Sequence, residues 1–137
     1  MSSPSPNTVP VAVKTPNNGN VQVSSAATST AGVGSSLAWS AGAVGSLISK
    51  IRIVVPLAAG ASSVPDILRI FKFNGTSYFI NQEFTVPVQT CSLSAGTGSF
   101  IKDYVPPTPW TEIAPTALYA ATVAGQVTNV EIEAGDY

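Results

Sequence analysis

The chain has 137 residues, the length of one ordinary domain, and only 9% of them are charged, with a formal net charge of −1. Typical soluble domains carry about 25% charged residues, so the sequence lacks the cationic surface that nucleic acid or an anionic membrane would require. It contains no histidine and a single cysteine, Cys91, which excludes an intrachain disulfide, a Ser-His-Asp triad and a histidine-ligated metal.

The first residues lack the basic start and apolar core of a secretory signal, and we expect synthesis in a reducing cytoplasm. Residues 26–48 are apolar by count but too rich in serine and glycine for a membrane span. A monomer keeps itself soluble with surface charge. We therefore expect neighbouring subunits to cover part of this weakly charged surface. A neutral surface rich in Ser, Thr and Asn is the alternative.

Residues 1–46 are poor in bulky side chains and predict an extended N-terminal arm that leads into a small-residue linker. Prolines occur near its start, and Asn17-Asn18-Gly19-Asn20 is typical of a turn. Valines alternate with period two on both sides of this turn, which favours a short β-ribbon or a strand-adding arm. These valines are Val9, Val11, Val13, Val21 and Val23. Residues 26–45, around Leu37 and Trp39, are the predicted linker.

Residues 47–137 predict the folded domain. Short runs of β-branched and aromatic residues, separated by Pro and Gly, predict strands at 47–57, 66–73, 78–86, 90–93, 100–104, 117–123 and 127–133. Asn74-Gly75 predicts a two-residue type I′ hairpin turn, and prolines before Trp110 predict a stiff loop. No window favours a helix. The sequence therefore predicts an all-β protein, a single jelly-roll-like β-sandwich with an N-terminal arm.

Few residues offer catalytic chemistry, and we expect no enzyme activity, cofactor or metal. Glu131 and Glu133 would share one strand face, which allows a two-carboxylate hydrolase or, with Asp136, a calcium site. A polar outer face of the sheet explains the two glutamates more simply. Cys91 has no histidine to activate it, so a buried core position is the simpler interpretation. Lysines in strand patterns are explained by a solvated face.

Aromatic residues are candidates for contact with a partner. Trp110 ends a proline-rich loop that we expect to be exposed, and exposed aromatic residues often mark contacts. With neighbouring tyrosines it could also stack on sugars, as in a carbohydrate-binding module. The candidate contact residues are Val9, Val11, Val13, Val21, Val23, Trp39, Trp110 and Tyr137.

Several segments together resemble a group of small virion proteins of tailed bacteriophages. These segments are Ile51-Arg52-Ile53, Leu68-Arg69-Ile70-Phe71, Asn74-Gly75-Thr76-Ser77-Tyr78, then Glu83, Val86 and Pro87, and the ending Gly135-Asp136-Tyr137. The resemblance covers residues 47–137 and implies a structural role in the virion, similar to head decoration (cement) proteins. It carries no catalytic residue.

The expected function is therefore a non-enzymatic capsid decoration protein that binds the major capsid protein or other virion subunits. We expect a homo-oligomer, such as a trimer, located in the virion after synthesis in the host cytoplasm. A neck, tail or fibre-attachment protein and a carbohydrate-binding module are the alternatives. The arm would clamp neighbouring subunits, so deleting residues 1–46 is expected to leave a folded core that no longer binds capsids.

Overall fold

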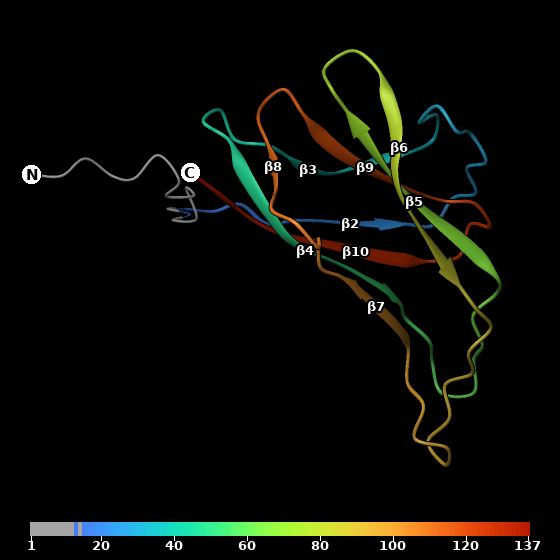
Figure 1. Ribbon diagram of the computed structural model, residues 1–137. Coiled ribbons are helices and arrows are strands. Elements are labelled where there is room, and N and C mark those ends of the chain that lie inside the picture. Colours follow the sequence, from blue (N-terminus) through green and yellow to red (C-terminus); the bar gives the residue numbers. More distant parts are fainter. Residues whose placement is uncertain (1–12, 14) are drawn as a thin grey trace, which may run out of the picture.

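The computed structural model describes residue 13 and residues 15–137, which form two antiparallel β-sheets packed face to face (Figure 1). The first sheet contains β1 (Thr15–Pro16), β2 (Gly19–Val23), β4 (Ser46–Val55), β7 (Phe100–Tyr104), β8 (Trp110–Glu112) and β10 (Thr128–Asp136). The second sheet contains β3 (Ser36–Ser40), β5 (Asp66–Phe73), β6 (Tyr78–Val86) and β9 (Ala117–Thr122). The described residues include no helix. The predicted all-β sandwich is confirmed.

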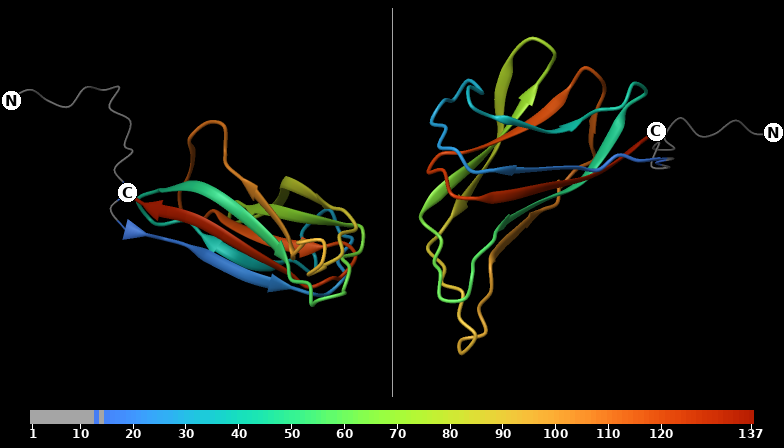
Figure 2. Two further views of the ribbon diagram at one scale, coloured as in Figure 1. Left: turned by 90° about the horizontal axis from the view of Figure 1, so that it is seen from below. Right: turned by 180° about the vertical axis from the view of Figure 1, so that it is seen from behind.

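The connectivity is that of a jelly roll. β1 and β2 follow one another along β10, and β7 and β8 follow one another along β4, so each sheet has four strand positions. Strands from the first half of the chain pair with strands in mirrored order from the second half: β2 with β10, β3 with β9, β4 with β7 and β8, and β5 with β6. This nested antiparallel pairing wraps the chain into two layers, which are also visible from below and from behind (Figure 2).

The core lies between the two sheets and follows the alternation of the long strands. In β4, Ile51, Ile53 and Val55 are buried, whereas the intervening Arg52 and Val54 are partly exposed. Side chains of successive strand residues point to opposite faces, so one face of β4 contributes to the core and the other faces outward. The other strands supply the rest of the core in the same way, through Trp39, Leu68, Ile70, Phe84, Leu118, Val130 and Ile132.

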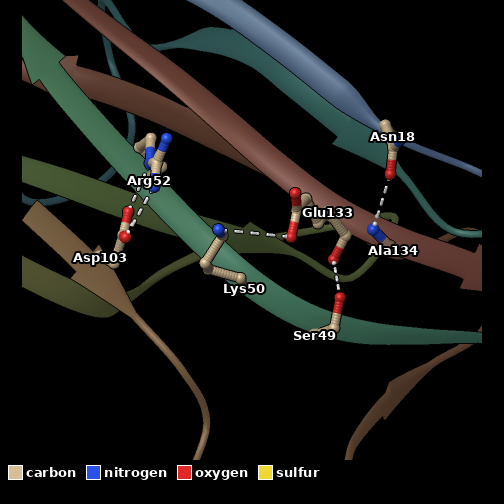
Figure 3. Close-up of polar contacts among 7 residues, drawn as sticks. All are labelled: Asn18, Ser49, Lys50, Arg52, Asp103, Glu133 and Ala134. Atoms are coloured by element: carbon tan, nitrogen blue, oxygen red, sulfur yellow. Dashed lines mark hydrogen bonds and ion pairs between the residues drawn. The ribbon is translucent and has the colours of Figure 1, made fainter.

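The N-terminal region differs from the predicted arm because residues 15–23 form an edge of the first sheet. β1 and β2 pair with β10 in one continuous register, so the chain runs straight through Asn17 and Asn18 instead of turning. The Asn17 backbone N–H donates to Ala134 O (2.9 Å), and the Asn18 side-chain oxygen accepts from Ala134 N (3.1 Å; Figure 3). Local composition favoured a turn, but these contacts with the distant β10 hold the segment extended.

The predicted linker also belongs to the sandwich. Residues 24–35 cross the outer face of the second sheet, and we call this segment the strap. Ala27 is buried there against Phe71 and Ala121, and its N–H donates to Thr122 O (2.9 Å). Small side chains let a backbone lie this close to a sheet, which explains a composition that by itself suggested a linker.

The β5–β6 hairpin is present, but its turn is longer than predicted. Phe73 pairs with Tyr78, which leaves a four-residue loop. Asn74 does not take the positive φ of a type I′ turn; Gly75 does, with φ of 97°. The Asn74 side-chain oxygen accepts from the N–H groups of Thr76 (2.9 Å) and Ser77 (2.8 Å). A side chain that closes its own turn is a common alternative for asparagine.

The predicted strand at 90–93 lies in a loop outside the sandwich. Cys91 exchanges hydrogen bonds with the β4–β5 loop, donating to Ala61 O (2.9 Å) and accepting from Gly60 N (2.8 Å). The two loops thus form a paired extension, at the bottom of Figure 1. Cys91 is a free, half-exposed thiol there, which corrects the expectation of a core cysteine.

Candidate interaction surfaces

Most of the described charged side chains are paired within the chain. The ion pairs are Lys50–Glu133 (3.6 Å), Arg52–Asp103 (2.6 Å), Arg69–Glu83 (3.0 Å) and Lys72–Glu112 (2.7 Å). Among the charged residues that the structure describes, Lys102 and Glu131 form neither an ion pair nor a hydrogen bond. A surface with so little uncommitted charge has little to offer an ionic partner.

Two of these pairs lie on the outer face of the first sheet (Figure 3). The Arg52 guanidinium donates to both carboxylate oxygens of Asp103, at 2.6 and 2.9 Å, across β4 and β7. This hydrogen bond lowers the pKa of Asp103 and raises that of Arg52. Lys50 lies opposite Glu133 in the same way, on β4 and β10. Direct cross-strand pairing of opposite charges is a normal way to stabilise a sheet.

Glu131 and Glu133 lie exposed on the same outer face, as the alternation predicted. Glu133 is engaged by Lys50. No group of three His, Cys, Asp or Glu residues in residues 13 and 15–137 could hold a metal ion. The calcium hypothesis therefore gains no support from the geometry.

Asp66, at the start of β5, is a carboxylate that the sequence did not single out. It accepts hydrogen bonds from the backbone N–H groups of Ile67 (2.7 Å) and Ala124 (2.8 Å) and from the Thr122 hydroxyl. A buried carboxylate must be satisfied by donors in this way. Asp66 thus ties β5 to the turn between β9 and β10 and serves the fold.

Asp136 fills a similar role at the end of the chain. Its Oδ1 atom accepts from the fully buried Ser46 hydroxyl (2.6 Å) and from the Asn17 amide (2.9 Å). The Ser46 Oγ in turn accepts from Gly42 N (2.8 Å). The Gly-Asp-Tyr ending therefore joins β10, β1 and the β3–β4 loop.

The predicted contact residues separate into three groups. Val9 and Val11 lie outside the described residues. Val23 and Trp39 are buried in the core, with Trp39 only 3% exposed and its indole N–H donating to Asn17 O (2.8 Å), so they are unavailable to a partner. The prediction failed for these two because it placed core strands in an arm. Val13 is exposed, and Val21, Trp110 and Tyr137 are half-buried.

Trp110 is less exposed than the prolines before it suggested. It begins β8, packs against the core, and donates from its indole N–H to Glu112 Oε2 (2.8 Å). It also borders a groove of about 280 Å³ between β6 and the β7–β8 loop. The other lining residues are Asn81, Gln82, Tyr104, Pro106, Pro107, Thr108 and Pro109. Aromatic rings beside amide groups are suited to a neutral polar ligand such as a sugar.

Several exposed apolar side chains were not predicted from the sequence. Leu93, in the loop extension, is 91% exposed, and Val44 and Ile113, at the opposite end of the sandwich, are 75% and 55% exposed. Two adjoining shallow grooves mark that opposite end. One, of about 420 Å³, is lined by Val13, Pro16, Leu47, Ser49, Ala134 and Gly135. The other, of about 390 Å³, is lined by Val44, Gly45, Thr111, Glu112, Ile113 and Tyr137.

The described residues form a jelly-roll β-sandwich whose surface includes exposed apolar side chains and an aromatic groove. No protein-family model matches the sequence. No curated protein matches it, and no solved structure does. No helix in the part of the chain that the structure describes is long and apolar enough to cross a membrane.

Proposed function

We propose that this protein is a non-enzymatic structural component of a tailed-phage virion, a decoration (cement) protein that binds the major capsid protein on the head. The observation that supports the proposal most strongly is the composition of the described surface. Its charges are largely paired with one another, whereas large apolar side chains are exposed at both ends of the sandwich. Such a surface is suited to burial against other subunits.

The fold is compatible with this role but does not distinguish it from other roles. Jelly rolls occur in viral capsid proteins and also in lectins and cupins, so function has to be argued from the surface. The resemblance to phage virion proteins supplies the virion context. Two of the segments that carry the resemblance stabilise the fold of this chain. Asn74 closes the β5–β6 hairpin, and Asp136 joins the two ends of the described chain.

Binding to the capsid would use the exposed apolar side chains of the sandwich, with Leu93, Val44 and Ile113 as the first candidates. Their burial in a shell would contribute roughly 1.5–3 kcal/mol for each fully covered side chain. The protein would act as a homo-oligomer, for which a trimer is the working hypothesis. It would be made in the host cytoplasm and then incorporated into the virion.

The copy number of the protein in purified virions tests the proposal. Quantitative mass spectrometry against the major capsid protein is expected to give one copy per one to a few capsid subunits. A ratio of a few per cent would instead place the protein in the neck, the tail or a fibre attachment. Absence from particles would overturn the virion role.

The aromatic groove favours a carbohydrate-binding module as the second candidate function. Tyr104 and Trp110 would stack on a sugar ring, and Asn81 and Gln82 would bond its hydroxyl groups. A glycan array with the wild type and the Trp110→Ala variant tests this idea, with circular dichroism to verify that the variant folds. Asn81→Ala, at an exposed position, serves as the milder second variant. Absence of any glycan signal from the wild type would eliminate this candidate.

A further inference from the structure

β7 forms an edge of the first sheet (Figure 1). It pairs with β4 along one side, and no described strand pairs with its other side. The backbone N–H and C=O groups on that other side therefore have no strand partner among the described residues. An unpaired edge of this kind can accept an extended segment of another chain as an additional strand.

Lys102, at the centre of β7, points toward the inside of the sandwich. It pairs with the fully buried Ile53 of β4, and directly opposed residues share one face of a sheet. Phe100 and Tyr104, two residues to either side, pack against the core from the same face. The Lys102 Nζ atom lies 6.0 Å from the ring centroid of the buried Phe84, on β6 of the second sheet. Because β7 is at the edge, the Lys102 side chain nevertheless remains exposed.

No side-chain carboxylate of this chain neutralises Lys102. All seven Asp and Glu residues of the sequence lie in the part of the chain that the structure describes. Six of them are ion-paired or hydrogen-bonded with other groups, namely Asp66, Glu83, Asp103, Glu112, Glu133 and Asp136. The seventh, Glu131, lies on the outer face of β10, which is separated from β7 by β4. A carboxylate that pairs with Lys102 therefore has to come from another molecule.

The charge of Lys102 restricts which strands can pair with β7. An added strand would place one of its own inward side chains directly beside Lys102. An apolar side chain there would remove water from the ammonium group without compensating its charge, which is unfavourable. A second copy of β7, paired antiparallel over all five residues, would place Lys102 opposite the same residue of that copy, and directly opposed like charges are destabilising.

We propose that β7 is a strand-addition site for an extended partner segment that carries an Asp or Glu opposite Lys102, and that Lys102 determines this specificity. The ion pair discriminates between partners mainly because neutral and basic strands are disfavoured. On the outer face of β7, Ile101 is 55% exposed and favours an apolar side chain in the same segment. This inference goes beyond the proposed function, because the requirement for a carboxylate applies to any partner strand, in a virion or elsewhere.

Charge reversal at residue 102 tests the proposal in the full-length protein, with a second copy of the chain as the probe. In an antiparallel pair of two β7 strands, Lys102→Glu in one copy would face Lys102 in the other. A tagged Lys102→Glu protein is therefore expected to retain untagged wild type at least several-fold better than tagged wild type does. The matched control is Thr85→Glu, which introduces a carboxylate at an exposed position of the other edge strand, β6, and should retain no more than wild type.

The neutral variant Lys102→Val provides a second measurement. It is expected to self-associate more strongly than wild type in sedimentation velocity, because no charge then opposes the pairing of two β7 edges. Circular dichroism verifies that the variants keep the sandwich. Retention of wild type by Lys102→Glu that is no better than by Thr85→Glu would overturn the proposal, as would a Lys102→Val protein that associates no more than wild type. Neither result bears on the copy number in virions, so failure of this inference is distinguishable from failure of the proposed function.

Discussion

At the residue scale, one glycine allows the two sheets to approach each other closely where β2 lies against β3. Gly19 on β2 lies against β3 of the other sheet, where a β-carbon would collide with the carbonyl oxygen of Ala38 and come within 2.9 Å of Trp39 Cβ. Backbone atoms cannot give way as a flexible side chain can. Only a residue without a side chain therefore fits at this point of β2, between its pairing with β10 and the backbone of β3.

Gly19→Ala is therefore expected to lower the free energy of unfolding by about 1–3 kcal/mol, the usual cost of overpacking. Urea denaturation measures it. Gly98→Ala is the control, because a β-carbon there meets nothing within 4 Å and should change stability by less than about 0.5 kcal/mol. Equal effects of the two substitutions would show that the close approach has no energetic role.

The Arg52–Asp103 pair predicts a specific dependence of stability on pH. Because the pKa of Asp103 is lowered in the folded state, its stabilising contribution is present above the unfolded pKa of about 3.9. The contribution is lost as pH falls through the folded pKa. The difference in unfolding free energy between wild type and Asp103→Asn should be constant from pH 7 to about 5 and shrink below about 4. A difference independent of pH would contradict this expectation.

At the element scale, the strap is the segment whose role is least expected from its composition. Gly32, with φ of 88°, lies on the Tyr78 ring, where a β-carbon would be 2.6 Å from Cγ. Tyr78 in turn packs against Phe73 and Tyr119, with ring centroids 4.5 and 5.1 Å away. Burial raises the pKa of Tyr78 above its usual value. The strap thus covers an aromatic cluster.

Gly32→Ala is expected to lift the strap from this cluster. Hydrogen exchange at residues 26–34 should become faster, and the pKa of Tyr78 should fall back toward about 10, as followed by absorbance titration of tyrosinate. Since the raised pKa favours the neutral phenol in the folded state, the stability linked to it is present below about pH 10. That stability is lost as pH rises through the folded pKa.

Gly60→Ala is the matched control for the strap. Gly60 has a similar φ of 83°, but a β-carbon there meets nothing within 4 Å. The backbone strain of the two substitutions is comparable, of order 1 kcal/mol, whereas only Gly32→Ala creates a clash. If both variants changed strap exchange equally, strain alone would explain the result.

At the scale of the whole molecule, the boundary predicted at residue 46 divides a single core. β2 and β3 contribute the buried Val23 and Trp39, and β2 covers the outer edge of β10. The folded unit described here therefore includes residues 15–46 together with the predicted domain.

Deleting residues 1–46 is accordingly expected to abolish cooperative unfolding, because β10 and β9 each lose a neighbouring strand and the core loses Trp39. Deleting residues 1–12 leaves every described strand intact and should preserve a cooperative transition. Thermal denaturation monitored by circular dichroism distinguishes the two deletions. A cooperative transition in the shorter chain would mean that residues 47–137 fold alone, as the sequence first suggested.

The sequence by itself determined the strands whose signal is local. Alternation in β4, the residue types of β5 and β6, and the turn residues between them needed no distant partner to be recognised. The sequence contains no histidine and few charged residues, and these facts alone narrowed the possible catalytic reactions and ionic partners.

Only the tertiary structure showed that residues 15–46 belong to the sandwich, and which of the described candidate contact residues are exposed. Gly19 lies against β3, Ala27 donates a hydrogen bond to β9, and the Trp39 indole donates to Asn17. The residues next to each of them in the sequence do not indicate these contacts. A run of small side chains has the same composition in a linker and in a strap packed on a sheet. The two differ only in the surface that the segment packs against. For the strap, that surface consists of Phe71 on β5, Tyr78 on β6 and Ala121 on β9, which all lie far from the strap in the sequence.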